Sequence, residues 1–240
     1  MSESDRYRFD TTRWSLVIRA ADEANPEARD ALDALCRIYW PPIYAFLRRR
    51  GWSITDAEDL TQGFFLNLLN RGGISRARAD RGRFRTFLLS SLKNFIADEH
   101  DRDEAQKRGG GQRVLSLDAG ESEDWLAREP SRDESPDQVF DRRWAGTVIE
   151  RALGRLEEVM TSTLGPERFA ALRPFLSGEV TGKYADVSRA LGVGESAVRV
   201  GVHRMRRRFG EILRDEVAHT VGSATDIEDE LRHLRQILTP

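Results

Sequence analysis

Residues 184–198 read YADVSRALGVGESAV, and this stretch decides the fold. One helical pattern lies before Gly192 and a second lies after it. Glycine tolerates the positive φ of a tight turn. The first pattern predicts a buried face made of Val187, Ala190 and Leu191. The second predicts an inner face made of Ala197, Val198, Val202, Met205 and Phe209. Two helices joined by such a turn predict a helix-turn-helix.

The outer face of the second helix is small and polar where the helix begins and cationic further along. In a recognition helix the first turn contacts base edges in the major groove, and later cations contact phosphates and set the register. The candidates for reading DNA are Ser196, Arg199, Val200, His203, Arg204, Arg206 and Arg207, and the first four of these are the base-reading candidates. The alternative is a solvated helix whose arginine-rich end complements the helix dipole.

Upstream of this motif, the spacing of apolar residues predicts further helices. One covers residues 13–50, and we expect Pro41 and Pro42 to break or kink it. The next is the clearest, because Thr55 and Glu58 form a capping box that a continuous apolar stripe follows. The stripe consists of Ala57, Leu60, Thr61, Phe64, Phe65, Leu68 and Leu69.

The middle of the chain changes character. Residues 112–143 are rich in Asp, Glu, Ser, Gly and Pro and show no sustained period, which predicts an acidic flexible linker. Helical spacing resumes near Trp144, and no strand-like alternation persists anywhere. We therefore expect an all-α protein with two small helical domains, residues 1–111 and 144–218, followed by a C-terminal helix in residues 219–240.

The C-terminal helix has its own start signal, a second capping box at Thr225 and Glu228. Its apolar face consists of Ile227, Leu231, Leu234 and Leu238. This helix either packs on its own chain or binds another protein. We favour packing on its own chain, because isolated short helices are only marginally stable in water.

Composition and charge limit the partners and the kinds of site that this chain can have. The net charge is −2, but acids gather in the linker while arginines crowd into residues 199–208, which suggests that different segments face different partners. The single cysteine, Cys36, cannot form an intrachain disulfide, and the sparse histidines offer it no zinc site. No apolar run approaches the roughly twenty residues of a membrane span, and the first ten residues are polar. We expect a cytoplasmic protein with no cofactor and no metal.

Two motifs resemble the extracytoplasmic-function branch of the sigma-70 family of RNA polymerase sigma factors. Residues 56–65, DAEDLTQGFF, are similar to that family's polymerase-binding helix, and residues 184–206 are similar to its promoter-reading helix-turn-helix. The resemblance covers most of residues 13–214. It implies a factor without enzymatic activity whose partners are core RNA polymerase and promoter DNA. The first domain would bind polymerase and open the minus-ten element, and the second would read the minus-thirty-five element.

The resemblance also assigns residues in the first domain. The polymerase-binding candidates, which lie outside the apolar stripe, are Asp56, Glu58, Asp59 and Gln62. The presence of the three acids among these residues has a second explanation: the positive N-terminus of a helix favours carboxylates in its first turn. The helix from residue 83 to 100 resembles the family's DNA-melting segment, and the minus-ten candidates are Arg81, Arg83, Arg85, Lys93 and Asn94. Guanidinium groups beside a cationic groove suit the capture of unstacked bases. By their helical spacing, Phe84, Phe87 and Phe95 belong to the core.

Further partners and rival functions remain open. An anti-sigma factor or a regulatory kinase acting on Thr61 would fit a sigma factor, although Thr61 lies on the buried stripe. One rival is a helix-turn-helix regulator that acts without polymerase. A second rival is a helical metal-dependent hydrolase that uses the i,i+4 pairs at residues 99 and 103 and at residues 100 and 104. No second helix with ligands at comparable spacing faces these pairs, so a solvated charged face explains them better.

Overall fold

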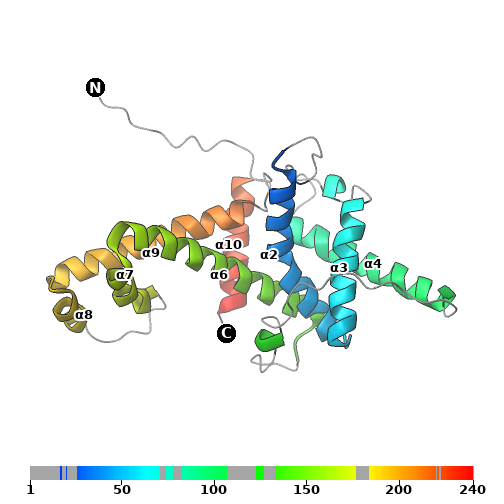
Figure 1. The fold of residues 1–240 in the computed structure, drawn as a ribbon, viewed down its shortest axis with the longest axis horizontal. Helices are drawn as coiled ribbons and strands as arrows, with labels where there is room; N and C mark the ends of the chain where they lie inside the picture. Colours follow the sequence, from blue (N-terminus) through cyan, green and yellow to red (C-terminus); the bar gives the residue numbers. More distant parts are fainter. Residues whose placement is uncertain are drawn as a thin grey trace. The chain divides into compact units, whose positions relative to one another are not determined.

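The computed structural model describes residues 17, 20, 26–70, 74–77, 83–106, 123–126, 133–176, 184–219, 221 and 223–239. All regular structure in this part of the chain is helical (Figure 1), which confirms the all-α prediction. The chain divides into two compact units, one of Met1–Trp144 with Ala218–Pro240, and the other of Ala145–Val217. Among the described helices, none combines the length and the apolar character that crossing a membrane requires.

The first unit contains α2 (Ala28–Arg49), α3 (Ile54–Asn70), the short 3-10 helix η1 (Ile74–Arg76), α4 (Phe84–Gln106), the start of α6 (Pro136–Leu164) and α10 (Ala224–Leu238). Of the two outcomes expected for Pro41 and Pro42, a break or a kink, the break does not occur, because α2 continues through both. Each proline removes one backbone hydrogen bond. Packing offsets this loss, since the helix is held by a nearly continuous buried run from Ile38 to Leu47.

The start of α3 lies earlier than the capping pattern predicted. The hydroxyl oxygen of Ser53 accepts a hydrogen bond from the backbone N–H of Asp56 at 3.1 Å, and the hydroxyl donates to the Asp56 carboxylate at 2.6 Å. The cap is therefore Ser53 and not Thr55, since Ser-x-x-Asp satisfies the same pattern. Likewise Ser223, and not Thr225, caps α10.

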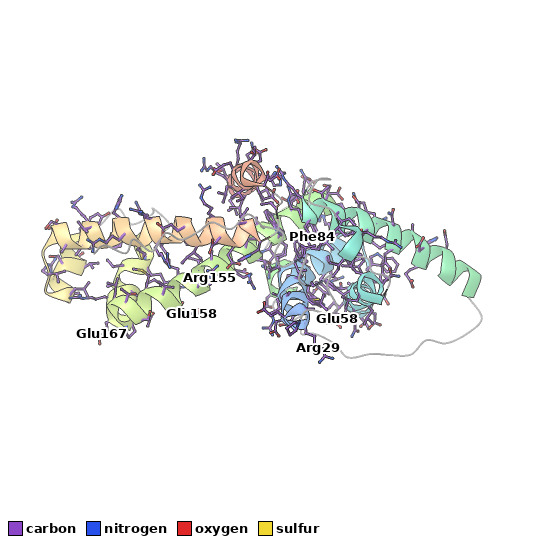
Figure 2. The ribbon with its side chains drawn as sticks, turned by 90° about the horizontal axis from the view of Figure 1, so that it is seen from above. Arg29, Glu58, Phe84, Arg155, Glu158 and Glu167 are labelled. Atoms are coloured by element: carbon purple, nitrogen blue, oxygen red, sulfur yellow. The ribbon has the colours of Figure 1, made fainter. Side chains whose placement is uncertain are left out.

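Aromatic rings from α2, α3 and α4 form the core of the first unit. Tyr39 and Phe84 meet edge to face with ring centroids 5.4 Å apart, and Phe64 meets Phe95 in the same way at 5.8 Å. Phe84, which is labelled in Figure 2, and Phe95 are both buried, as predicted. Phe87 is only half-buried.

The second unit contains α6 from residue 145, α7 (Pro166–Leu172), the 3-10 helix η3 (Arg173–Leu176), α8 (Tyr184–Leu191) and α9 (Glu195–Ala218). Its core is formed by Ala152, Leu156, Met160, Phe169, Leu172, Phe175, Val198, Val202, Met205 and Ile212. The predicted linker extends too far, because α6 already begins at Pro136. Proline suits the first position of a helix, because the N–H that it lacks would have no partner there.

A buried carboxylate joins the two long helices of the second unit. Glu216 of α9 is 5% exposed and receives Arg151 at 3.0 Å and Arg155 at 2.6 Å, both from α6. Arg155 is labelled in Figure 2. Burial alone would raise the pKa of Glu216, but the two guanidinium groups outweigh it and hold this pKa below its ordinary value of 4.5. The carboxylate is therefore ionised and paired at neutral pH.

Candidate nucleic-acid interface

The acidic edge of α3 lies opposite its buried stripe. Asp56 and Asp59 are exposed, while Glu58, labelled in Figure 2, and Gln62 are half-buried. Asp56 also serves the helix cap, in agreement with the interpretation of its charge as a helix N-terminal feature. Thr61 is fully buried, and its hydroxyl donates to the backbone carbonyl of the preceding turn at 2.6 Å.

The start of α4 carries two arginines that are already paired. Arg83 is half-buried, with its Nε 2.9 Å from Oε2 of Glu230 on α10. Arg85 is 8% exposed, and its guanidinium contacts both Glu230 and Asp141 at 2.6 Å. The same guanidinium lies over the ring of Trp144, 5.2 Å from its centroid. In this structure Arg85 is therefore a buried ion-pair partner and not a surface cation.

The remaining minus-ten candidates are further along α4 or outside the described residues. Lys93 is exposed and pairs with Asp137 at the start of α6, 2.7 Å away. Asn94 is exposed and borders a cavity. Arg81 lies outside the described part of the chain.

The cavity beside Asn94 has a volume of about 270 Å³. It is lined by Phe64, Asn67, Leu68, Arg76, Phe87, Ser91, Asn94, Phe95 and Asp98. Aromatic rings form part of its wall, and amide, hydroxyl, guanidinium and carboxylate groups supply hydrogen-bond donors and acceptors. A flat aromatic wall with polar groups around it is the chemistry that binds an unstacked nucleobase. Phe87, assigned to the core from its spacing, is thus partly a cavity residue.

The stretch predicted to form a helix-turn-helix contains two helices, α8 and α9, on either side of Gly192. Gly192, between α8 and α9, has a φ of +63°, which few other residues tolerate. The hydroxyl of Ser188 donates to the carbonyl of Val193 and closes the turn at 2.5 Å. Two details of the predicted inner faces are wrong: Ala190 and Ala197 are exposed. Both lie next to the turn, Ala190 in the last turn of α8 and Ala197 in the first turn of α9.

The outer face of α9 presents all seven predicted DNA-reading residues as exposed side chains. They form two adjacent rows at helical spacing, one through Ser196, Val200 and Arg204 and the other through Arg199, His203 and Arg207. Val200 is 49% exposed, which is unusual for a large apolar side chain. The guanidinium of Arg199 lies over the ring of Tyr184, 4.5 Å from its centroid, and 3.9 Å from the carboxylate of Glu195.

Arg206 differs from the other arginines on α9, because its guanidinium is already occupied. It donates two hydrogen bonds to the backbone carbonyl of Phe175 in η3, at 3.0 and 2.6 Å. Arg207 and Arg208 both lie near the carboxylate of Glu211, at 3.1 and 3.2 Å. These last contacts join exposed groups, so they constrain the two arginines weakly.

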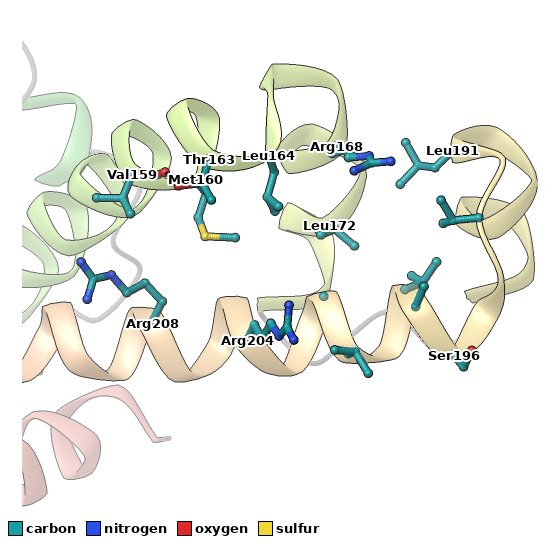
Figure 3. A pocket seen from close by; sticks show the side chains of 15 residues that line it. Val159, Met160, Thr163, Leu164, Arg168, Leu172, Leu191, Ser196, Arg204 and Arg208 are labelled. Atoms are coloured by element: carbon teal, nitrogen blue, oxygen red, sulfur yellow. Dashed lines mark hydrogen bonds between the residues drawn. The ribbon is translucent and has the colours of Figure 1, made fainter. Parts of the chain in front are cut away.

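An open groove of about 710 Å³ lies beside this face within the second unit. Figure 3 shows side chains of α6 and α7, including Met160 and Leu172, across the groove from Arg204 and Arg208 of α9. Gly201 lets α9 approach α7 closely, because a Cβ there would lie 3.3 Å from a methyl carbon of Leu172. The glycine in the recognition helix is thus explained by helix packing.

Sequence reasoning did not find the carboxylates that pair with the candidate cations. Glu230 is the main example, and one signal pointed to it. It lies three residues after Ile227 and four before Leu234, on the apolar face of the C-terminal helix. An acid at such a position must be paired when the face packs, so it predicts a buried cationic partner.

Comparison with known proteins gives two matches. Residues 35–106, which include α3 and α4, match the family model described as Sigma-70 region 2. The chain is also 27% identical over 198 residues to the ECF RNA polymerase sigma factor SigE of Mycolicibacterium smegmatis (strain ATCC 700084 / mc(2)155), an alignment that covers 82% of this chain and 67% of that protein. No solved structure matches the chain significantly. The region 2 match and the likeness along most of the chain agree with the helices and motifs found above, and together they support a place for the chain in the extracytoplasmic-function group of the sigma-70 family.

Proposed function

We propose that this sigma factor divides promoter recognition between its two units. The edge of α3 binds core RNA polymerase, the surface of α4 holds the opened minus-ten strand, and the outer face of α9 reads the minus-thirty-five element. One observation carries the proposal: the segment that matches region 2 contains both an acid-edged helix and a cavity suited to a base. Such a protein works in the cytoplasm, where polymerase and chromosome meet.

The role of α3 follows from the separation of its two faces. The buried stripe holds the helix on the core, and Asp59 points outward with its charge exposed. An exposed carboxylate on a rigid helix attracts a basic partner surface at little desolvation cost, and it raises the association rate more than the final affinity. Asp56 and Glu58 add to the same negative edge.

The role of α4 follows from the cavity that Asn94 borders. Opening the duplex leaves bases unstacked, and a protein keeps them apart by stacking and by hydrogen bonds to their edges. Phe87 offers a ring for stacking, while Asn94 and Arg76 offer donors within the same cavity. Contacts to the phosphates need cations nearby, and these are Lys93 on α4 and Arg83 immediately before this helix.

The role of α9 follows from the change along its outer face, where the side chains are small and polar at the start and cationic further along. Arg199 is the strongest base-reading candidate, because a guanidinium pairs with the two acceptors on the major-groove edge of guanine. Val200 adds an exposed apolar group, which matches the methyl group of thymine. Arg204 and Arg207, one and two turns later, are suited to phosphate contacts. Arg206 contributes to positioning the helix instead.

The rival functions have less support. Among the described side chains, no three from His, Cys, Asp and Glu gather closely enough to bind a metal ion. The side chains at residues 103 and 104, which the hydrolase would also use, lie outside the described ones. A regulator that acts without polymerase would not need the region 2 helices. We leave a kinase acting on Thr61 out of the proposal, because its hydroxyl is buried. An anti-sigma factor would have to cover one of the three surfaces named above.

A binding experiment with core polymerase tests the role of α3. Reversing the charge of the exposed edge with Asp59→Arg should weaken association about tenfold, which corresponds to about 1.4 kcal/mol. Asp101→Arg, at an exposed acid on α4, makes the same change in net charge and should leave core affinity unaltered. Equal affinities for wild type and Asp59→Arg would contradict this role.

A further inference from the structure

The arginines at the start of α4 are held by one carboxylate from the far end of the chain. Glu230 of α10 lies 2.9 Å from Nε of Arg83 and 2.6 Å from Nε of Arg85. Its second oxygen also accepts a hydrogen bond from Nη2 of Arg85 at 3.3 Å. Two of the three arginines predicted to contact the opened minus-ten strand are therefore paired with an acid of the same chain.

The position of Glu230 in α10 makes this contact obligatory for docking. Glu230 is 1% exposed and lies between Ile227 and Leu234, which are 0% and 4% exposed. A carboxylate buried this far costs several kcal/mol unless it is paired and hydrogen-bonded. The α10 helix can therefore pack in place only when Glu230 pairs with the two arginines.

We propose that α10 is an autoinhibitory element whose Glu230 stands in for DNA phosphate on Arg83 and Arg85. Carboxylate and phosphate both take the forked donors of a guanidinium, so the two cannot occupy it together. The α10 helix must leave before these arginines contact the minus-ten strand. This inference rests on the proposed function of α4.

The contact is suited to being reversible. The α10 helix has fifteen residues, and a helix of this length is only marginally stable away from its partner. Its release is a local opening that leaves the aromatic core of α2, α3 and α4 in place. Arg85 keeps Asp141 as a partner when α10 leaves. By contrast, the side chains of Lys93 and Asp137 are 45% and 50% exposed, so their ion pair is weak. That pair is therefore too weak to provide the autoinhibition.

The test compares full-length wild type with Glu230→Gln, which keeps the size of the side chain and one acceptor for Arg85. The probe is a short fluorescent single-stranded DNA, because phosphate contacts do not depend on sequence. We expect Glu230→Gln to bind the probe about tenfold more tightly at low salt, the gain of about one charge-assisted contact. With Arg83 released, and Arg85 still paired with Asp141, the slope of log K against log salt should steepen by about 0.7.

Two further variants separate this effect from others. Asp229→Asn removes the same charge from α10 at a residue whose contact is with Arg232 of its own helix, so binding should change little. Ile227→Ala loosens the packing of α10 with every charge kept, and it should also tighten binding. Binding by Glu230→Gln and Ile227→Ala no tighter than by Asp229→Asn would overturn the autoinhibitory role.

The arginines themselves provide the last check. Arg83→Gln, added to Glu230→Gln, should abolish the gain in affinity, whereas a gain that persists would show that Arg83 is not the released contact. Failure of the proposed function gives a different result, namely no initiation by the wild-type chain with core polymerase. A chain that initiates normally, and whose Glu230→Gln variant binds DNA like wild type, would refute autoinhibition alone.

Discussion

The guanidinium of Arg206 is bound to the backbone carbonyl of Phe175 by two hydrogen bonds, at 3.0 and 2.6 Å. Phe175 lies in η3 and is buried, so this contact ties the recognition helix to the turn before the helix-turn-helix. Arg207, the next residue, pairs with the exposed carboxylate of Glu211 at 3.1 Å. Adjacent arginines on α9 thus have different tasks.

A pair of substitutions tests this division. Arg206→Ala should lower the free energy of unfolding by about 1–2 kcal/mol, because it removes hydrogen bonds from a charged donor. Arg207→Ala should leave stability unchanged and weaken binding to duplex DNA, with a salt slope shallower by about 0.9. Denaturant unfolding and salt titration of DNA binding provide the two measurements. Equal losses of stability in both variants would count against the assignment.

The turn of the helix-turn-helix gives a second prediction. Gly192 has a φ of +63°, and a Cβ in this region costs about 1–2 kcal/mol. Gly192→Ala should therefore lower the free energy of unfolding by that amount. The matched control is Gly210→Ala in the interior of α9, where no atom lies within 4 Å of the new Cβ. That control should gain about 0.5–1 kcal/mol, and opposite signs in the two variants are the expected result of thermal unfolding.

The helix-turn-helix was the part of the fold best predicted from sequence. Its apolar spacing and Gly192 specify local structure through short-range sterics, and α8 and α9 follow them. The starts of α3 and α10 were each predicted two residues late, because two overlapping capping patterns compete there and local sequence does not decide between them. Pro41 and Pro42 do not end the helix, because the burial of their neighbours outweighs the local penalty of each proline.

A pH prediction follows from Glu216. Its folded-state pKa is below the ordinary value of 4.5, because Arg155 and Arg151 stabilise the carboxylate against the cost of burial. The stability from this group is fully present above 4.5 and is lost as the pH falls through the lowered folded-state pKa. The second unit should therefore lose stability in acid below pH 4.5. Glu216→Gln should be less stable than wild type at pH 7, and the difference should shrink in acid. A difference that is independent of pH would contradict the ion pair.

The candidate site was less predictable than the fold. Spacing identified exposed faces, and the exposed residues of α9 and α3 lie where expected. It could not identify which cations are already paired, because the partners are distant in sequence: Arg85 and Glu230 are 145 residues apart. The cavity beside Asn94 likewise needs α3, η1 and α4 together. Local sequence patterns identify the buried and exposed faces of a helix. Ion pairs and cavities form only when several elements pack together.

The central claim is that this chain directs initiation by binding polymerase and promoter DNA through separate units. In vitro transcription with purified core polymerase and genomic DNA fragments tests it most directly. We predict discrete transcripts that require both the chain and core polymerase, whose start sites share a minus-ten and a minus-thirty-five element, and which Arg199→Ala redistributes. The absence of specific transcripts, together with tight and specific duplex binding by the chain alone, would contradict the claim and favour a regulator that acts without polymerase.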